Sequence, residues 1–329
     1  IPAASTLMGL SAHPTDHPLN IGMLGMHGNY GPNKMTGEAD VIIAMGMRFD
    51  DRVAQDVKKF AAQAQIIHME IDPSEVSKNI LAHIPVLGDL KQTLPLLTRA
   101  CKGKAYPEWM QTYRGYHAYE EEKVIRPLLY PSTPEITMAE AVRVVNEQTG
   151  GEAVVVTDVG QHQMIGARYA KLNTPRSFIT SGGLGTMGYG LPAAIGAKLG
   201  APDKDVVLFV GDGGIQMTIQ ELGTIMESKV GVKIVVLNNG FLGMVRQWQE
   251  LFHGGRYSST PIMSPDFIAI AAAYGIPGQK VSDRTDLSGA IDNMFSTPGA
   301  FFLEVMVGAE DNVFPMIPAG KSVDDIRFA

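Results

Sequence analysis

Short apolar runs separated by helix-like stretches recur along this chain, and they limit the folds open to it. Runs of this kind, without polar alternation, suit strands that are buried on both faces of a parallel sheet. The stretches between them suit helices that cover the two faces. We therefore expect an α/β fold with doubly wound parallel sheets, and ligands at the carboxyl ends of the strands. The predicted strands are 41–45, 65–71, 86–87, 153–157, 205–210, 233–237 and 301–305.

The length of 329 residues is natural for two domains. Between them, five charged residues fall within 120–126 and three prolines follow, which indicates a helical arm and an extended linker. We expect a first domain at 1–103, an arm and linker at 104–133, and a second domain at 134–329.

Local signals predict three helices. The first covers 51–64. The second begins at a capping box, Thr137-x-x-Glu140, and ends at Gly150-Gly151. A further capping box, Thr218-x-x-Glu221, predicts the helix that follows the strand 205–210.

Composition narrows the class of protein. The net charge of -7 and the absence of a Lys/Arg block disfavour nucleic acid as a partner. No apolar stretch is long enough to cross a bilayer. Cys101 is the only cysteine, which rules out an internal disulfide and favours a reducing, cytoplasmic location. The chain begins Ile1-Pro-Ala-Ala-Ser5 without a basic leader or an initiator Met, and we expect it to be part of a longer protein.

The segment after the predicted strand 205–210 carries the clearest chemical signal. It reads Gly211-Asp-Gly-Gly214, in which glycines let the backbone approach a ligand closely. The next predicted strand ends at Asn238-Asn239, and Asn239 lies 27 positions after Asp212. A right-handed crossover of about thirty residues brings the ends of two such strands side by side.

A carboxylate and an amide oxygen at one sheet edge are hard ligands, as are the oxygens of a diphosphate. Magnesium takes six such ligands, and a backbone carbonyl just beyond Asn239 and a water would complete the set. The glycine amides and the start of the following helix would meet the remaining phosphate charge. The pattern therefore predicts a diphosphate-bearing cofactor held through a divalent metal. The alternative is that Asp212 only caps a helix and Asn238-Asn239 only forms a turn.

With these residues in place, the sequence resembles the acetolactate synthase (acetohydroxyacid synthase) family, in particular the carboxy-terminal part of its catalytic subunit. The Gly211-Asp-Gly and Asn238-Asn239 pair resembles the thiamine diphosphate motif. The resemblance implies a truncated, Rossmann-like middle domain followed by a thiamine-diphosphate-binding domain. The segments that carry it are Thr6–Leu10, Met23–Gly28, Gly46–Arg52, Gly160–Met164, Gly182–Pro192, Gly243–Trp248 and Val313–Pro318.

The resemblance implies three cofactors: thiamine diphosphate, Mg2+ and a structural FAD without a net redox role. The implied metal ligands are Asp212, Asn239 and the backbone carbonyl of Phe241. The implied thiamine diphosphate contacts are Val159, Gly160, Gln161, His162, Gly185, Met187, Asp212, Gly213, Gly214, Asn239, Gly243 and Met244. The implied FAD contacts are Thr6, Leu7, Leu24, Met26, His27, Gly46, Arg48, Asp50, Arg52, Glu70, Asp89 and Gln163. The implied catalytic residues are Met187, which would bend the cofactor into a V, Met244 and Trp248 in the substrate pocket, and Arg52 at the channel.

Plainer roles remain open for several of these residues. His162 could be an ordinary loop residue, and Met187, Met244 and Trp248 could be core. The charges within 48–52 could form a solvated cluster, and Glu70 could only cap Ser74. The sequence departs from the family pattern in two places, since 240–242 lacks the usual polar residues and Gly214 replaces a frequent hydroxyl residue. A backbone ligand tolerates the first change, and the second weakens one phosphate contact without removing the amide.

The implied reaction joins two pyruvates to 2-acetolactate with loss of CO2, or pyruvate and 2-ketobutyrate to 2-aceto-2-hydroxybutyrate, in branched-chain amino-acid synthesis. The implied partners are a second copy, as homodimer or dimer of dimers, and a regulatory small subunit. The family's activating glutamate lies on an amino-terminal domain outside these residues, so the fragment alone is expected to be inactive. Two alternatives stay open. One is another thiamine diphosphate enzyme, such as a pyruvate oxidase, a glyoxylate carboligase or a sulfoacetaldehyde acetyltransferase, and the other is a non-catalytic interaction module.

Overall fold

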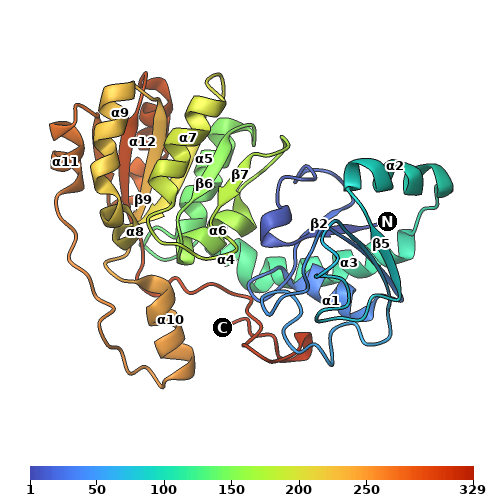
Figure 1. Cartoon of the computed structure of the whole chain (residues 1–329). Coiled ribbons are helices and arrows are strands. Elements are labelled where there is room, and N and C mark those ends of the chain that lie inside the picture. The colour runs from blue at the N-terminus through green and yellow to red at the C-terminus, as the bar shows by residue number, and fades with distance from the viewer. The chain divides into compact units, whose positions relative to one another are not determined.

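The computed structural model describes residues 1–329, and their contacts divide the chain into two compact units (Figure 1). Unit 1 comprises Ile1–Thr6, Pro18–Val124 and Phe314–Ala329, and unit 2 comprises Leu7–His17 and Ile125–Val313. The end of the chain thus belongs to unit 1 by its contacts, whereas the expected second domain includes it. The domain boundaries expected from the sequence stay a prediction.

Unit 2 is built around a six-stranded sheet in which every neighbouring pair of strands is parallel. Its strands are β6 (Val154–Thr157), β7 (Phe178–Thr180), β8 (Val206–Gly211), β9 (Val232–Asn238), β10 (Gly278–Val281) and β11 (Phe301–Met306). Their order across the sheet is β10-β11-β9-β8-β6-β7. The four inner strands match predicted runs. The two edge strands, β7 and β10, lie outside the predicted set because edge strands are short and need no continuous apolar run.

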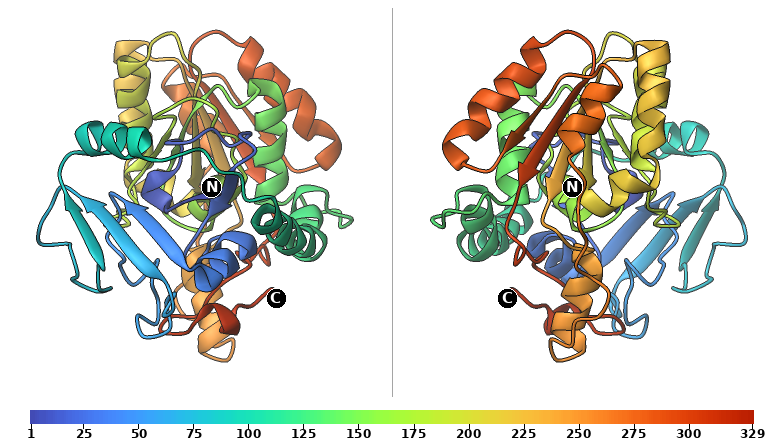
Figure 2. Two further views of the ribbon diagram at one scale, coloured as in Figure 1. Left: turned by 90° about the vertical axis from the view of Figure 1, so that its right-hand side faces the viewer. Right: turned by 90° about the vertical axis from the view of Figure 1, so that its left-hand side faces the viewer.

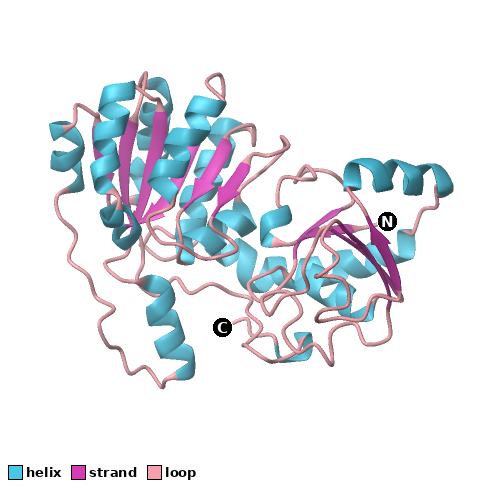
Figure 3. Cartoon of the chain, in the orientation of Figure 1, coloured by secondary structure: helices cyan, strands magenta, loops and turns pink.

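Helices cover both faces of this sheet (Figure 3). The helices of unit 2 are α4 (Arg126–Leu129), α5 (Met138–Thr149), α6 (Gln161–Tyr169), α7 (Gly190–Gly200), α8 (Asp212–Met217), α9 (Leu222–Ser228), α10 (Gly243–Phe252), α11 (Phe267–Ala273) and α12 (Arg284–Ser296). One core cluster joins α5, α6 and α12 to one face of the sheet, and a second joins α7, α8, α9 and α11 to the other. The turned views show the sheet between these layers (Figure 2). The expected doubly wound α/β fold is confirmed.

The strand order creates a crevice at one point of the sheet. Strands β7 and β8 lie on opposite sides of β6, so the winding direction changes between β6 and β8. Ligands of such sheets bind outside the carboxyl ends of the strands at this switch point. Next to it, β8 and β9 pair in register from Val206↔Val232 to Gly211↔Leu237, so their carboxyl ends are level. Asp212 and Asn239 therefore follow neighbouring strand ends, as the sequence predicts.

Of the first predicted capping box of unit 2, the Thr137 cap is confirmed, while the Glu140 side chain bonds to Arg284 instead of the cap backbone; the second predicted box is wrong. Thr137 accepts a hydrogen bond from the backbone N–H of Glu140, and Gly150 ends α5 in the left-handed conformation. Thr218 caps nothing, because its hydroxyl donates instead to the carbonyl oxygen of Gly188, 3.0 Å away. Only a 3-10 turn follows Thr218, and α9 begins after it.

Unit 1 contains two small parallel sheets, β1-β2 and β3-β4-β5. Its elements are β1 (Ala3–Ser5), β2 (Asn20–Met23), α1 (Tyr30–Glu38), β3 (Val41–Met45), β4 (Gln65–Glu70), β5 (Ile84–Leu87), α2 (Leu90–Ala100) and α3 (Pro107–Glu120). The segment expected as a helical arm contains α3, a π-helical turn at Glu121–Ile125 and α4. The fully buried carboxylate of Glu120 fastens α3 to the start of α1 by accepting hydrogen bonds from Asn29 Nδ2 and Tyr30 N.

The helix predicted over 51–64 is wrong. These residues form a series of separate turns, closed by bonds such as Ala54 N to Asp50 O and Phe60 N to Asp56 O. Gln55 and Ala61 adopt positive φ angles of 52° and 44°, which a right-handed helix does not allow. Apolar periodicity alone does not reveal such breaks.

None of the helices combines the length and the apolar character that a membrane crossing requires.

Two glycines of unit 2 provide a matched test of its helices. Gly150 has φ +60° and Gly196 lies exposed within α7, and a Cβ at either position would meet no atom within 4 Å. Gly150→Ala should lower the free energy of unfolding by about 1 kcal/mol because alanine resists the left-handed conformation. Gly196→Ala should raise it by about 0.5–1 kcal/mol because alanine favours helix. Urea denaturation checks both values, and equal signs for the two variants would contradict this account of α5 and α7.

Candidate functional site

A pocket lies at the carboxyl ends of β6, β8 and β9, which is the switch point of the sheet. About 400 Å³ of space here is free of protein atoms, part of it open to solvent. Most of the residues expected to contact thiamine diphosphate line it: Val159, Gly160, Gln161, His162, Met187, Asp212, Gly213, Gly214, Gly243 and Met244. Phe241, an expected metal ligand, lines it too. Gly185, Asn239 and Trp248 are not among its lining residues.

Asp212 is 1% exposed at the floor of this pocket. Burial raises the pKa of its carboxyl to about 6, and the hydrogen bond that the Ser264 hydroxyl donates to Asp212 Oδ2 at 3.4 Å partly offsets this effect. A buried carboxylate without a cationic partner is costly, and a divalent cation would remove that cost.

Asn239 is held in one orientation by a chain of side-chain amides. Its Nδ2 donates to Gln161 Oε1 at 3.3 Å, and Gln161 Nε2 donates to Gln247 Oε1 at 3.1 Å. Gln247 is fully buried, and its Oε1 also accepts from the backbone N–H of Val313 at 2.9 Å. Because Asn239 Nδ2 donates to Gln161, the orientation of the Asn239 amide is fixed, and its Oδ1 is available as an acceptor. It receives only Phe241 N at 3.1 Å, which leaves room for a further ligand.

His162 contributes an unsatisfied nitrogen. The side chain is 5% exposed, and its buried Nε2 has no hydrogen-bond partner within the protein. Burial lowers the pKa of the imidazole to about 4, although the charge of Asp158 opposes this shift. The ring is therefore neutral near pH 7, and Nε2 can serve a polar ligand in the pocket.

Glycines leave the space in which these side chains and a ligand fit. A Cβ on Gly243 would come within 2.1 Å of Gln161 Oε1, and a Cβ on Gly211 within 3.0 Å of the His162 ring. At Gly213 it would come within 2.8 Å of Leu242. The donor set and this glycine cradle fit a metal-bound diphosphate. No cluster of three or more His, Cys, Asp or Glu side chains offers another metal site.

The expected substrate-pocket residues differ in their placement. Met187 and Met244 are half-buried and line the pocket, so neither is simple core. Trp248 lies on α10 one turn beyond Met244 and packs its ring on Phe252, with 4.8 Å between centroids. The site assignment of Trp248 stays a prediction.

Sequence reasoning missed several residues of this site. Met138, Leu242 and Val245 also line the pocket. They are ordinary apolar residues, and no sequence signal distinguishes them. Asp158 and Gln247 are different, because both are fully buried polar residues. Asp158 follows a predicted strand two positions before Gly160, and Gln247 lies inside the recognised segment Gly243–Trp248. A polar residue at a strand end or within a recognised motif is the signal that would have found them.

The residues of unit 1 that are expected to contact FAD share one structural position. Each lies at or just after the carboxyl end of a parallel strand: Thr6 after β1, Leu24, Met26 and His27 after β2, Gly46, Arg48, Asp50 and Arg52 after β3, Glu70 at the end of β4 and Asp89 after β5. Leu7 and Gln163 belong to unit 2. There, Gln163 is buried and donates from Nε2 to Thr180 Oγ1 at 2.8 Å.

Exposed charges surround the end of β3. Arg48 pairs with Asp50 at 2.8 Å, and Arg52 with Asp51 at 3.6 Å. Glu70 does not cap Ser74. Its Oε1 accepts from the backbone N–H of Ile71, and Asp72 caps Ser74 instead.

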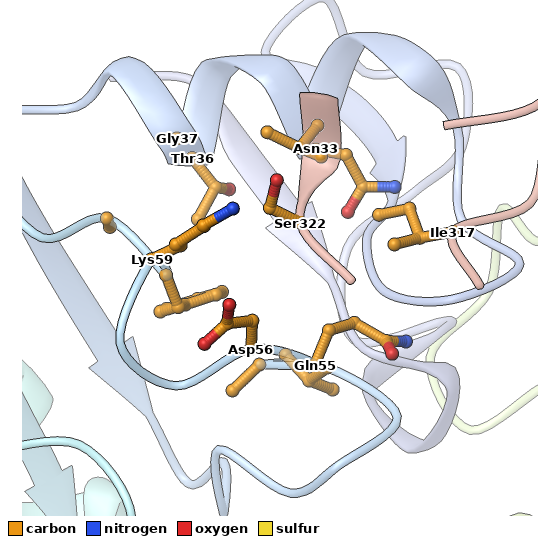
Figure 4. A pocket seen from close by; sticks show the side chains of 13 residues that line it. Asn33, Thr36, Gly37, Gln55, Asp56, Lys59, Ile317 and Ser322 are labelled. Carbon is orange, nitrogen blue, oxygen red and sulfur yellow. The ribbon is translucent and has the colours of Figure 1, made fainter. Parts of the chain in front are cut away.

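A second pocket lies within unit 1, between α1, the turns of 53–61 and the end of the chain (Figure 4). Asn33, Gln55, Asp56, Lys59 and Ser322 contribute polar groups to it. None of the site residues expected from the sequence lines this pocket.

Comparison with known proteins finds two domain matches along the chain, and both belong to the same group of enzymes. Residues 158–305 match the thiamine pyrophosphate enzyme C-terminal TPP binding domain, and residues 1–97 match the central domain of the same enzymes. The two matches together cover more than half of the chain. The chain belongs to the thiamine pyrophosphate enzyme family.

Within this family the chain is homologous to acetolactate synthase large subunits. It is 42% identical to the acetolactate synthase large subunit of Lactococcus lactis, over 99% of this chain and 56% of that protein. It is 41% identical to the isozyme 2 large subunit of Escherichia coli, over 98% of this chain and 58% of that protein. It is 42% identical to the chloroplastic acetolactate synthase 1 of Nicotiana tabacum, over 99% and 50%. The chain spans about half the length of these relatives.

The lowered pKa of His162 predicts that the free energy of unfolding of this protein depends on pH. Since the folded-state pKa of about 4 lies below the ordinary value, the unfolded chain binds more protons between these two pKa values. The free energy of unfolding therefore falls as the pH decreases from about 6.5, by about 2 kcal/mol between about pH 7 and about pH 5. Urea denaturation of a His162→Gln variant should lack this component. The exposed His253→Gln is the matched control and should keep it. Equal pH slopes for His162→Gln and the wild type would contradict the prediction.

Proposed function

We propose that this chain is the carboxy-terminal part of an acetolactate synthase catalytic subunit. The intact protein would condense two pyruvates to 2-acetolactate with loss of CO2, or pyruvate and 2-ketobutyrate to 2-aceto-2-hydroxybutyrate. The observation that carries the proposal is the single pocket in which the Gly211–Gly214 segment, Gln161, His162, Met187 and Phe241 meet at the sheet's switch point. Homology to acetolactate synthase large subunits over nearly the whole chain supports the choice among thiamine pyrophosphate enzymes.

A magnesium ion would be held by three groups of this chain: the Asp212 carboxylate, the Asn239 side-chain oxygen and the carbonyl oxygen of Phe241. The burial of Asp212 and the fixed amide of Asn239 support this ligand set. Oxygen ligands with a single carboxylate leave positions for two phosphate oxygens and a water. A metal held there would neutralise charge on both the Asp212 carboxylate and the diphosphate.

The remaining residues of the pocket would bind and orient the cofactor. The unpartnered His162 Nε2 would donate to the diphosphate, and the glycine backbone at 213–214 would lie along it. Met187 would support the bend between the two rings with a flexible apolar side chain. The carbonyl of Gly185 would accept from the aminopyrimidine. When bound, thiamine diphosphate supplies a carbanionic carbon that adds to a keto carbon and stabilises the charge left by decarboxylation.

Substrate contacts would come from Met244, Trp248 and Arg52. Met244 offers apolar surface inside the pocket. Trp248, as a flat wall, would favour the ethyl group of 2-ketobutyrate over the methyl group of pyruvate by pocket contact. The arginine would attract a 2-keto acid, whose carboxylate suits a guanidinium.

A structural FAD would bind at the strand ends of unit 1. The rule that all its expected contacts in unit 1 follow carboxyl ends of parallel strands supports this site. As partners we propose a second copy of the subunit and a small regulatory subunit, and as location the cytoplasm.

One strand provides a matched pair of variants for the metal site. Asp212 lies at the carboxyl end of β8, and the exposed Asp205 lies just before its amino end. In the intact protein, Asp212→Ala should weaken magnesium-dependent thiamine diphosphate binding by more than about a hundredfold because the cation loses its only carboxylate. Asp205→Ala should bind as the wild type does. Titration calorimetry with and without magnesium measures both affinities.

The same proteins test the reaction. Wild type and Asp205→Ala should form acetolactate from pyruvate, and Asp212→Ala should not. Near wild-type affinity in Asp212→Ala would refute the metal site. Cofactor binding by the wild type together with a product other than acetolactate would refute the proposed reaction.

A further inference from the structure

Asp158 is a buried carboxylate for which the proposed function has no use. It follows β6 directly and is fully buried, at the switch point of the sheet. Its Oδ2 accepts from the backbone N–H of Gly190 at 2.7 Å, and its Oδ1 accepts from that of Gly188 at 3.2 Å. Hydrogen bonds to an ionised acceptor are stronger than neutral ones, and a buried carboxylate is costly unless it makes them.

The surroundings of Asp158 leave room for the carboxylate and little else. A Cβ on Gly214 would come within 2.5 Å of Asp158 Oδ1, and one on Gly190 within 2.9 Å of Asp158 Cβ. Gly188 has φ +84°, a conformation that other residues rarely adopt. The carboxylate therefore contacts the start of α8 and the segment 182–190 at once.

Apart from the hydrogen bond that Thr218 Oγ1 donates to the carbonyl oxygen of Gly188 at 3.0 Å, the segment 182–190 has few other attachments. Leu184 is 93% exposed, and its neighbours Gly183, Gly185 and Thr186 are exposed as well. At its beginning, Ser181 accepts from the backbone N–H groups of Gly185 and Thr186 at 2.9 and 3.1 Å. Since apolar packing contributes little here, the position of Met187 depends on hydrogen bonds at the two ends of the segment.

We propose that Asp158 is a positioning residue that holds the segment 182–190 so that Gly185 and Met187 face the cofactor. This inference rests on the proposed function, because it gives those two residues their role. Asp158 acts through the backbone amides of Gly188 and Gly190, which follow Met187. Asp158 is not among the residues that line the pocket.

The test uses Asp158→Asn and Asp158→Ala in the intact protein. Asparagine keeps the shape, but its NH2 group faces one of the two amides, so one hydrogen bond is lost. Alanine loses both. Hydrogen exchange of the peptide that contains Gly188 and Gly190, read without cofactor, should be about tenfold faster or more in each variant. At saturating thiamine diphosphate and magnesium, the near-ultraviolet circular dichroism of the bound cofactor should weaken, since Met187 no longer enforces one ring geometry.

Glu140→Gln is the matched control, because Glu140 is another buried carboxylate that binds Arg284 and lies outside the pocket. It should lower thermal stability and leave both the exchange of 182–190 and the cofactor signal unchanged. Unchanged exchange in both Asp158 variants would overturn the anchor. Faster exchange with a wild-type cofactor signal would overturn the positioning role. A wild type that binds no thiamine diphosphate would overturn the proposed function, whereas the exchange result judges the anchor by itself.

Discussion

The parallel pairing of β8 with β9 is the constraint on which the candidate site depends. Their register brings Gly211 level with Leu237, and so sets the turn that begins at Asp212 beside the turn that contains Asn239. A slip of one residue would exchange the faces of a strand that is buried on both sides. Because both core clusters hold these strands, the hydrophobic core fixes the distance between two polar groups that it does not itself contain.

The polar side chains at this edge of the sheet are buried, and their burial costs free energy. Asp212, His162 and Asp158 are all buried, and burial disfavours the charged forms of the first two. Groups of this kind concentrate where a ligand completes their interactions. The amides of Gln161 and Gln247 belong to the same arrangement, since they are buried and committed to one hydrogen-bond direction. These buried polar groups lower the stability of the fold, and in return their side chains are held in one orientation, which is typical of a binding site.

The sequence predicts the inner strands of unit 2 well because burial on both faces demands continuous apolar runs. It misses β7 and β10, which lie at the edges of the sheet and are not under that demand. The helix over 51–64 fails for another reason, since positive φ angles at Gln55 and Ala61 leave no trace in apolar periodicity. Thr218 has the spacing of a cap, yet its hydroxyl bonds to a segment thirty residues earlier in the chain.

The residues of the candidate site also differ in how far the sequence predicts them. Asp212 and Asn239 are predictable because their spacing follows from one βαβ unit. Asp158 and Gln247 bond to partners that are distant in the sequence, so the sequence can mark them as candidates but only the folded chain reveals what they contact. The residues of unit 1 that the sequence predicts as FAD contacts lie at strand ends, where ligands of such sheets bind. Their role as FAD contacts is a proposal.

The central claim is that a divalent metal and a diphosphate meet at the ends of β8 and β9. Anomalous diffraction from crystals of the intact protein, grown with thiamine diphosphate and Mn2+ in place of Mg2+, measures this directly. The account predicts an anomalous peak within about 2.5 Å of the Asp212 carboxylate and the Asn239 side-chain oxygen. A peak elsewhere in the chain, or ordered cofactor at this edge with no metal beside Asp212, would contradict it.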